Sequence, residues 1–283
     1  MKVWIEATRP KTLIISIAPI LIGTVLASKI HWITFFLTLI CGLSIQIGTN
    51  FANDYFDYKQ GSDTKERQGP RRLIPAGIIS ERSMRRALII AFALAFLAGL
   101  YLTAVGGWGI FVLLLLAIGS GIGYSMGRLS LSRTGLADLF VFVFFGPVAV
   151  LSTYYLQTGT IDWMLVWASL APGLIPVAVL TANNLRDRIE DKKCRKRTLT
   201  VRFGKKFGQW QYTLCLLGGI LSIIPLLKIQ LTLIITLAAL IPSFTTITTV
   251  WTYKQSQELI AVLAGTGKIL LLYTFLFVVG ALI

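Results

Sequence analysis

Acidic residues, histidine and cysteine are scarce in this sequence. His31 is the single histidine among 283 residues, and because it falls in a short connection between apolar runs, we exclude a catalytic histidine. The three cysteines, Cys41, Cys194 and Cys215, form no C-x-x-C pair, so the sequence supports neither a disulfide framework nor a zinc site. Asp and Glu together number 12, against 27 Lys and Arg, which makes the placement of the few acids informative.

The composition is too apolar for a water-soluble domain of this length. Hydrophobic residues make up 55% of the chain and charged residues 14%, and the mean hydropathy is +0.75. We therefore predict an all-α, polytopic membrane protein whose surroundings are the lipid bilayer. In a soluble protein the net charge of +15 would suggest nucleic acid, but here the basic residues lie in loops, where they set membrane orientation. We expect no nucleic-acid partner.

Apolar runs near the roughly 20 residues that a membrane-crossing helix needs predict a bundle of nine transmembrane helices. The predicted spans are residues 12–28, 32–52, 87–104, 108–126, 135–156, 163–182, 210–227, 231–251 and 259–283. No second soluble domain is apparent, so residues 1–283 are predicted to form a single transmembrane domain. The long loops at about residues 54–86 and 183–209 are then the places for chemistry.

The basic residues predict the orientation of this bundle. With the N-terminus in the cytoplasm, only Lys29 and Lys228 fall outside, and Lys268 lies toward the inner end of the last span. This asymmetry is what the positive-inside rule predicts. We therefore expect an integral protein of the cell (plasma or inner) membrane, with the active site opening to the cytoplasm.

Seven of the 12 acidic residues form two short patches, each at the end of an apolar run. The patches consist of Asp54, Asp57, Asp63 and Glu66, and of Asp187, Glu190 and Asp191. Aligning Asn50-x-x-x-Asp54-x-x-Asp57 with Asn183-x-x-x-Asp187-x-x-Glu190 superposes one amide and two carboxylates. We interpret the patches as pseudo-repeated motifs, because repeated halves of a membrane bundle often share one site between them.

The spacing of these carboxylates predicts a magnesium site. If the helices continue past the membrane boundary, Asp54 with Asp57, and Asp187 with Asp191, each point in one direction. Mg²⁺ is commonly held by one or two carboxylates together with substrate phosphates, so two facing patches could clamp a diphosphate. The predicted metal ligands are Asp54, Asp57, Asp187 and Asp191, with Asp63 beyond a helix end expected at Gly61. The amides of Asn53 and Asn184 can donate to phosphate oxygens.

The sequences of both patches resemble the aspartate-rich motifs of the UbiA-type intramembrane prenyltransferases. The matching segments are Asn50-Phe-Ala-Asn53-Asp54-Tyr-Phe-Asp57 with Arg71-Arg72 after it, and Asn183-Asn184-Leu-Arg186-Asp187-Arg-Ile-Glu-Asp191 with Arg197 after it. The segments Arg9-Pro10-Lys-Thr-Leu13, Phe144-Phe145-Gly146 and Thr153-Tyr154-Tyr155 agree. Within that superfamily the sequence is most similar to the enzymes that prenylate 1,4-dihydroxy-2-naphthoate in menaquinone biosynthesis, a branch of quinone biosynthesis.

The resemblance implies a Mg²⁺-dependent transferase. It would move the polyprenyl group of a polyprenyl diphosphate to an aromatic acceptor, 1,4-dihydroxy-2-naphthoate, with loss of carbon dioxide, giving demethylmenaquinone. It also implies that the four motif aspartates are catalytic through the metal, and that the diphosphate is steadied by Asn53, Lys59, Arg72, Asn184, Arg186 and Arg197. Aromatic rings can stabilise the allylic cation; Tyr58 and Tyr124 are preferred among Tyr55, Tyr58, Tyr124, Phe142, Tyr154 and Tyr155. No general base is identified.

The sequence departs from the family pattern at some positions, and two alternative functions stay open. Arg195 stands where the motif usually has glycine, and the segment ending in Ala137-Asp138, where Gly-Glu is usual, is expected to help shape the acceptor pocket. Other acceptors, namely 4-hydroxybenzoate, haem or a futalosine-type intermediate, stay open. A cation-coupled transporter is the alternative class, but transporter carboxylates usually lie near the bilayer midplane, whereas both patches here lie at predicted cytoplasmic ends.

Overall fold

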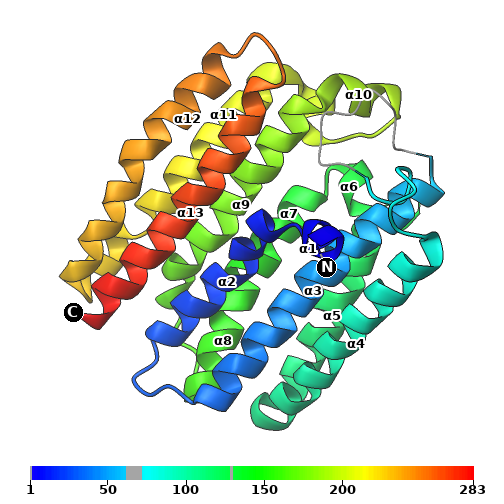
Figure 1. Cartoon of the computed structure of the whole chain (residues 1–283). Helices are drawn as coiled ribbons and strands as arrows, with labels where there is room; N and C mark the ends of the chain where they lie inside the picture. Colours follow the sequence, from blue (N-terminus) through cyan, green and yellow to red (C-terminus); the bar gives the residue numbers. More distant parts are fainter. Residues whose placement is uncertain (1, 62–71, 128–129) are drawn as a thin grey trace.

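The computed structural model describes residues 2–61, 72–127 and 130–283. Within these ranges every regular element is helical and no strand occurs, so the predicted all-α class is confirmed for this part of the chain. The helices lie side by side in a bundle (Figure 1). In chain order they are α1 (Lys2–Thr8), α2 (Pro10–Val25), α3 (Trp32–Lys59), α4 (Glu81–Gly106), α5 (Trp108–Gly123), α6 (Leu131–Thr134), α7 (Ala137–Val143), η1 (Phe144–Val148), α8 (Ala149–Thr158), α9 (Leu165–Arg186), α10 (Arg188–Lys193), α11 (Leu199–Leu221), η2 (Ile224–Lys228), η3 (Leu231–Ala239), α12 (Leu240–Thr252) and α13 (Glu258–Leu282).

Seven helical segments of the described chain are long and apolar enough to cross a membrane. They are Trp32–Lys59, Glu81–Gly106, Ala137–Thr158, Leu165–Arg186, Leu199–Lys228, Leu231–Thr252 and Glu258–Leu282. The chain is therefore an integral membrane protein. The other two predicted spans coincide with α2 and α5, which are apolar but have only 16 residues each, fewer than the roughly 20 that a straight crossing needs. The count of nine spans stays a prediction.

Both motifs lie where a long apolar helix extends beyond its apolar part. Helix α3 continues to Lys59, seven residues past the end predicted for its apolar span, and the chain turns at Gly61 with φ of 61°, a conformation that glycine adopts without strain. Helix α9 ends at Arg186, and α10 begins at Arg188 after the non-helical Asp187. The helical extension that the carboxylate spacing required is therefore present in the first motif and nearly continuous in the second.

The Phe144-Phe145-Gly146 segment forms a bend rather than a straight helix. Gly146 has φ −97° and ψ −107°, followed by Pro147, and the turn is π-helical. The bend brings the backbone against α9: a Cβ atom on Gly146 would lie 2.9 Å from the carbonyl oxygen of Ser169 and 3.0 Å from Cα of Gly173. Only glycine permits this approach, which places α7 beside the helix that carries the second motif.

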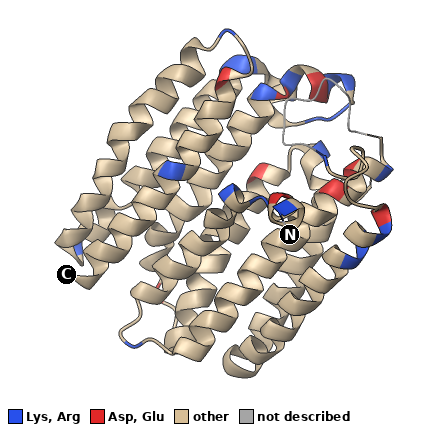
Figure 2. Ribbon diagram, in the orientation of Figure 1, with Lys and Arg blue, Asp and Glu red and all other residues tan. Residues whose placement is uncertain are grey.

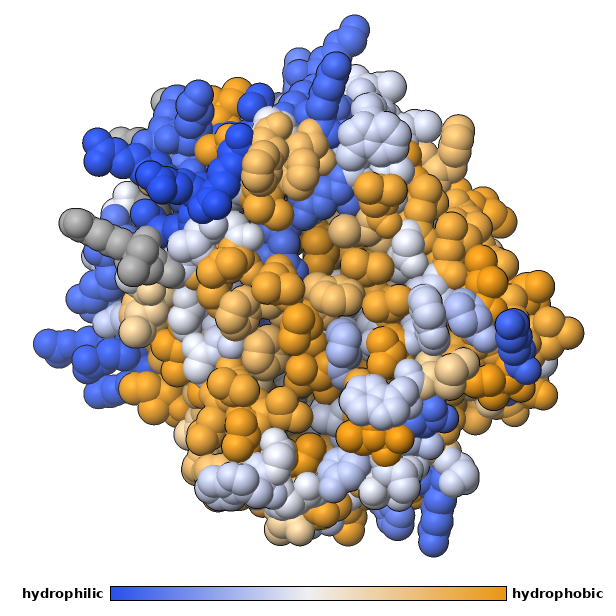
Figure 3. All heavy atoms as spheres, turned by 180° about the vertical axis from the view of Figure 1, so that it is seen from behind, coloured by the Kyte–Doolittle hydropathy of each residue, from blue (hydrophilic) through white to orange (hydrophobic). Residues whose placement is uncertain are grey.

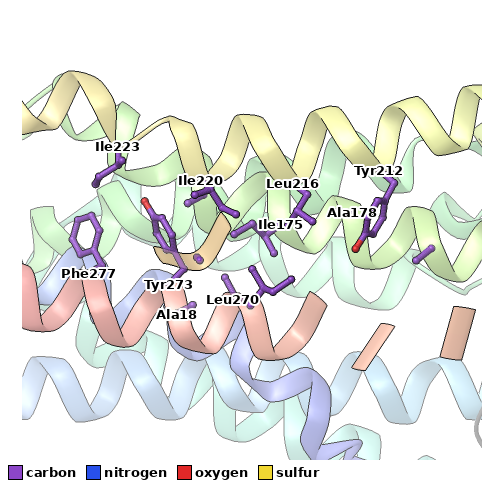
Figure 4. Packing of buried hydrophobic residues seen from close by; sticks show 14 of the residues in the cluster. Ala18, Ile175, Ala178, Tyr212, Leu216, Ile220, Ile223, Leu270, Tyr273 and Phe277 are labelled. Carbon is purple, nitrogen blue, oxygen red and sulfur yellow. The ribbon is translucent and has the colours of Figure 1, made fainter. Parts of the chain in front are cut away.

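The main core lies between α2, α9, α11 and α13 (Figure 4). Ile175, Leu216 and Leu270 are fully buried there, and the Tyr212 hydroxyl shares a 2.7 Å hydrogen bond with Thr266. Lipid tails are as apolar as leucine, so close packing and interhelical hydrogen bonds, not exclusion of water, hold such helices together. This packing fixes α9, and with it the second motif, relative to the rest of the bundle.

Charge is concentrated at one end of the bundle. Figure 2 shows most Lys, Arg, Asp and Glu residues near α6, α10 and the C-terminal end of α3, with few along the helices. Seen from behind, apolar side chains cover much of the surface, and hydrophilic ones gather along the margin that corresponds to this end (Figure 3). Both acidic motifs therefore lie at the same end of the molecule.

Candidate active site

The two motifs meet at one cavity of about 80 Å³. From the first motif it is lined by Asn53, Asp57 and Arg72, and from the second by Asn183, Asn184, Asp187, Glu190 and Asp191. Asp57 and Asp187 thus face a common space although 130 residues separate them in the sequence. One bound group could contact both motifs.

In the first motif, Arg72 lies between the carboxylates. Its guanidinium pairs with both Asp54 and Asp57, and its Nη2 donates to Oδ1 of Asn53 at 3.1 Å. Asp54 is 3% exposed and does not line the cavity; it also pairs with Arg9. Because neighbouring carboxylates repel unless cations sit between them, the two arginines offset the repulsion within this buried cluster.

Arg9 is a site residue that the sequence analysis did not identify. Its backbone is left-handed, with φ of 52° and ψ of 67°, which costs a residue other than glycine roughly 1–2 kcal/mol. Pro10 follows at the first position of α2, where its fixed φ suits a helix start. The Arg9-Pro10 segment was noted only as part of a family resemblance; its strained turn directs the guanidinium to Asp54.

In the second motif, Arg186 holds Asp187 with two hydrogen bonds. Its Nε lies 2.7 Å from Oδ1 and its Nη2 lies 2.6 Å from Oδ2 of Asp187, the bidentate geometry that favours a carboxylate or phosphate partner. Asp191 pairs with Lys196, with Nζ 3.0 Å from Oδ1. The amide N–H of Asp191 donates to the carbonyl of Asp187 at 2.8 Å, which keeps the two aspartates one helical turn apart.

Three of the predicted site residues have exposed side chains that do not line the cavity. Lys59 pairs with Glu81 at 2.7 Å and has a side chain 51% exposed, Tyr58 is 40% exposed, and Arg197 is also exposed; none lines the cavity. Lys196, which the sequence analysis did not select, lines it instead. Asp63 lies outside the described residues.

A second, larger cavity of about 740 Å³ adjoins the first. Asn53, Tyr124, Leu180 and Asn183 line both. The rest of its wall is mainly apolar and comes from several helices, including Ile20, Ile45, Leu102, Ile110, Leu114, Phe140, Phe144 and Leu156. Along α3 the wall extends from Thr38 to Asn53, about 22 Å at ~1.5 Å per residue. An anionic head and a long apolar tail could therefore bind as one continuous ligand.

The donor set suits Mg²⁺ completed by phosphate oxygens. Within the described ranges, no three His, Cys, Asp or Glu side chains converge as a ready-made metal cage. Asp57, Asp187 and Asp191 instead line the same cavity, and they offer carboxylate oxygens from both motifs. Mg²⁺ typically uses one or two carboxylates and leaves its remaining positions to water and substrate phosphates, so the residues present fit the ion.

The chain is similar to known prenyltransferases over nearly its whole length. Residues 16–263 match the sequence model of the UbiA prenyltransferase family. The 1,4-dihydroxy-2-naphthoate octaprenyltransferase of Haemophilus influenzae is 35% identical over 307 aligned residues, covering 100% of this chain and 96% of that protein. The enzyme of the same name from Mycobacterium tuberculosis is 36% identical over 284 residues, covering 99% and 96%. A UbiA homolog from Archaeoglobus fulgidus bound to GPP and Mg²⁺ has a TM-score of 0.70 over 99% of both chains at 14% identity, a likeness of fold alone.

Proposed function

The chain belongs to the UbiA prenyltransferase family, and from this premise we propose that it transfers a polyprenyl group from polyprenyl diphosphate to 1,4-dihydroxy-2-naphthoate. The carboxylate of the acceptor leaves as carbon dioxide, and the product is the hydroquinone form of demethylmenaquinone, an intermediate of menaquinone biosynthesis. Support for this acceptor comes from relatives 35–36% identical over almost their whole length that carry the matching name.

The observation that carries the proposal is the junction of the two cavities. A polyprenyl diphosphate has a highly charged head and a long apolar tail, and the charged and apolar cavities meet at Asn53, Tyr124 and Asn183. The bond that must break joins head to tail, so it would lie at this junction. The large cavity has room for a chain of several isoprene units.

The motif residues would bind the diphosphate head. Asp57, Asp187 and Asp191 would hold Mg²⁺, with Asp54 and Asp63 as further proposed ligands. When bound, Mg²⁺ neutralises charge that develops on the departing diphosphate. Arg72, Arg186 and Lys196 would contact phosphate oxygens, because each already holds a motif carboxylate at the cavity. These fixed charges act most strongly where water is excluded.

Tyr124 is the proposed residue for the allylic cation. It lines both cavities, and the face of a tyrosine ring attracts a positive charge within about 6 Å. The apolar wall beyond it keeps water from the cation, which would otherwise be captured as an alcohol. Tyr58, being exposed, fits this role less well.

We further propose nine membrane crossings with the N-terminus and the active site on the cytoplasmic side of the cell membrane. The basic residues at the motif end support this orientation. Helices α2 and α5 would complete the nine, at places where the bilayer is thinned, because each has only 16 residues. Labelling of single cysteines placed at Lys29 and Lys193 with a membrane-impermeant reagent tests the orientation; labelling of Lys193→Cys from the outside would contradict it.

Purified protein in detergent, given a polyprenyl diphosphate and Mg²⁺, tests the reaction. We expect prenylated, decarboxylated product with 1,4-dihydroxy-2-naphthoate, detected by mass spectrometry and abolished by EDTA. Parallel reactions with 4-hydroxybenzoate, haem and a futalosine-type intermediate test the acceptor. Turnover of one of these in preference to the naphthoate would move the proposal to that acceptor. Absence of product and of diphosphate release with every acceptor would favour a cation-coupled transporter.

A further inference from the structure

A buried carboxylate outside both motifs also faces the active-site cavity. Asp138, on α7, is 7% exposed and lines the smaller cavity together with Tyr124 and Leu180. Its Oδ1 accepts a 2.7 Å hydrogen bond from Nε2 of Gln211 on α11. Its Oδ2 has no hydrogen-bond partner within the described chain. Ionisable groups buried in a membrane bundle are rare, and such a residue is by default a candidate functional residue.

Asp138 differs in its partner from the motif carboxylates of the same cavity. Asp57 and Asp187 pair with arginine, and Asp191 pairs with lysine. Asp138 has only the neutral amide of Gln211 among the described side chains. The Gln211 amide occupies one oxygen of Asp138 and brings no charge, which leaves the other oxygen open to a hydroxyl of a bound ligand. Asp138 is therefore suited to proton transfer, and the motif carboxylates to charge binding.

We propose that Asp138 is the acid–base residue of the reaction, accepting the proton of the acceptor hydroxyl next to the reacting carbon. This inference rests on the proposed function. Tyr124 and Leu180 line both cavities, so an aromatic ring at the junction would lie between the diphosphate and the apolar cavity, beside Asp138. Gln211 is a positioning residue, since its amide fixes one carboxylate oxygen and leaves the other for the acceptor.

The step balances without any further reactant. The ring carbon that bears the carboxylate forms a bond to C1 of the prenyl group, while the C–O bond to the diphosphate breaks and its electron pair leaves with the diphosphate. The neighbouring hydroxyl becomes a carbonyl as its proton moves to Oδ2 of Asp138. The bond to the carboxylate then breaks, carbon dioxide leaves, and the electron pair restores the ring as an enolate. The enolate oxygen takes the proton back from Asp138, which ends as it began.

The Asp138→Asn variant tests this role. It keeps the shape of the side chain but cannot accept the proton, so we expect kcat to fall about 100-fold or more, with KM for the prenyl diphosphate unchanged within about twofold. Asp162→Asn, at an exposed acid, is the matched control and should retain wild-type activity. Asp138→Glu should recover at least about tenfold over Asp138→Asn, because it restores the basic oxygen.

An acceptor analogue separates proton transfer from a merely structural role. A naphthoate with an electron-withdrawing group on its distant ring ionises its hydroxyl more readily. The loss of kcat in Asp138→Asn should therefore be at least about fivefold smaller with this analogue than with the natural acceptor. An equal loss of kcat with both acceptors, or Asp138→Asn activity within about threefold of wild type, would overturn the inference. The proposed function would still stand if the wild-type protein turned over the natural acceptor. Wild-type protein without prenyl transfer would instead refute the proposed function. If Asp138→Asn does not fold, Gln211→Leu and Asp138→Glu are assayed with the two acceptors instead. A smaller loss of activity with the analogue than with the natural acceptor supports the inference, and an equal loss overturns it.

Discussion

Replacing Arg72 with methionine distinguishes two roles of the first motif. One role is to stabilise the protein without ligand, and the other is to bind a metal ion. The Arg72 side chain is 6% exposed and contacts Asp54, Asp57 and Asn53. Methionine keeps much of its length but carries no charge. Asp57 then loses its arginine partner, and Asp54 keeps the pairing with Arg9.

The expected cost follows from the burial of these carboxylates. Removing one partner of a buried ion pair typically destabilises by about 3–5 kcal/mol, because the remaining charge is left uncompensated. For a chain of this size that corresponds to a fall in Tm of about 10 °C. Mg²⁺ should oppose the loss, since in Arg72→Met a metal ion can bind the carboxylates without displacing a guanidinium. We therefore expect Mg²⁺ alone to raise Tm more in Arg72→Met than in the wild type.

The assay is thermal unfolding in detergent, with EDTA, with Mg²⁺, and with NaCl at matched ionic strength. Lys59→Met is the control: its pair with Glu81 is exposed, and exposed pairs contribute only about 0–1 kcal/mol. An Arg72→Met protein that unfolds at the wild-type temperature in EDTA would refute the ion-pair reasoning. Equal Mg²⁺ shifts in variant and wild type would refute the view that Arg72 and the metal share the same carboxylates.

Three further predictions concern the metal site, the apolar cavity and a strained turn. Asp187→Asn should lower kcat about 100-fold or more through loss of metal and diphosphate binding, whereas Glu81→Gln, at an exposed acid, should stay near wild type in the same product assay. Leu102→Trp should narrow the apolar cavity and lower kcat/KM about tenfold for a long polyprenyl diphosphate; an equal loss with geranyl diphosphate would count against this path for the tail. Arg195→Gly should raise stability by about 0.5–1 kcal/mol, because φ at Arg195 is 56° and relief of left-handed strain exceeds the entropic cost of glycine; Arg195→Ala should not, and an equal gain from both in thermal unfolding would contradict this.

The helical class and the clustering of the motifs could be predicted because both depend on short-range pattern. Apolar runs fix the helices, and a carboxylate spacing of three or four residues fixes one face of a helix. The same periodicity also bears on Lys59, which was predicted to contact the diphosphate: Lys59 is two residues beyond Asp57 in α3, and residues two apart do not share a helix face. Its pairing with Glu81 is consistent with that rule.

Other parts of the site depend on backbone geometry and on contacts distant in sequence, which pattern does not reveal. Lys196 and Arg197 are adjacent and both basic, yet only Lys196 reaches the cavity. They follow the left-handed turn at Arg195, and a single turn decides which of two neighbouring side chains points inward. Arg195 was recognised as a departure from glycine, and its positive φ gives the physical reason why glycine is usual there.

The distribution of partners explains how a cavity with so many acids can exist in a membrane protein. Arg72, Arg186 and Lys196 neutralise Asp57, Asp187 and Asp191 within the protein, and Mg²⁺ with a diphosphate would bring both signs of charge to the same place. On ligand binding, a metal ion can pair with the carboxylates while the phosphates pair with the arginines and the lysine. This exchange of partners leaves few buried charges unpaired at any stage. Asp138 stands outside this exchange, since its partner is neutral. A residue whose protonation must change during the reaction is best placed where no fixed cation holds it in one state.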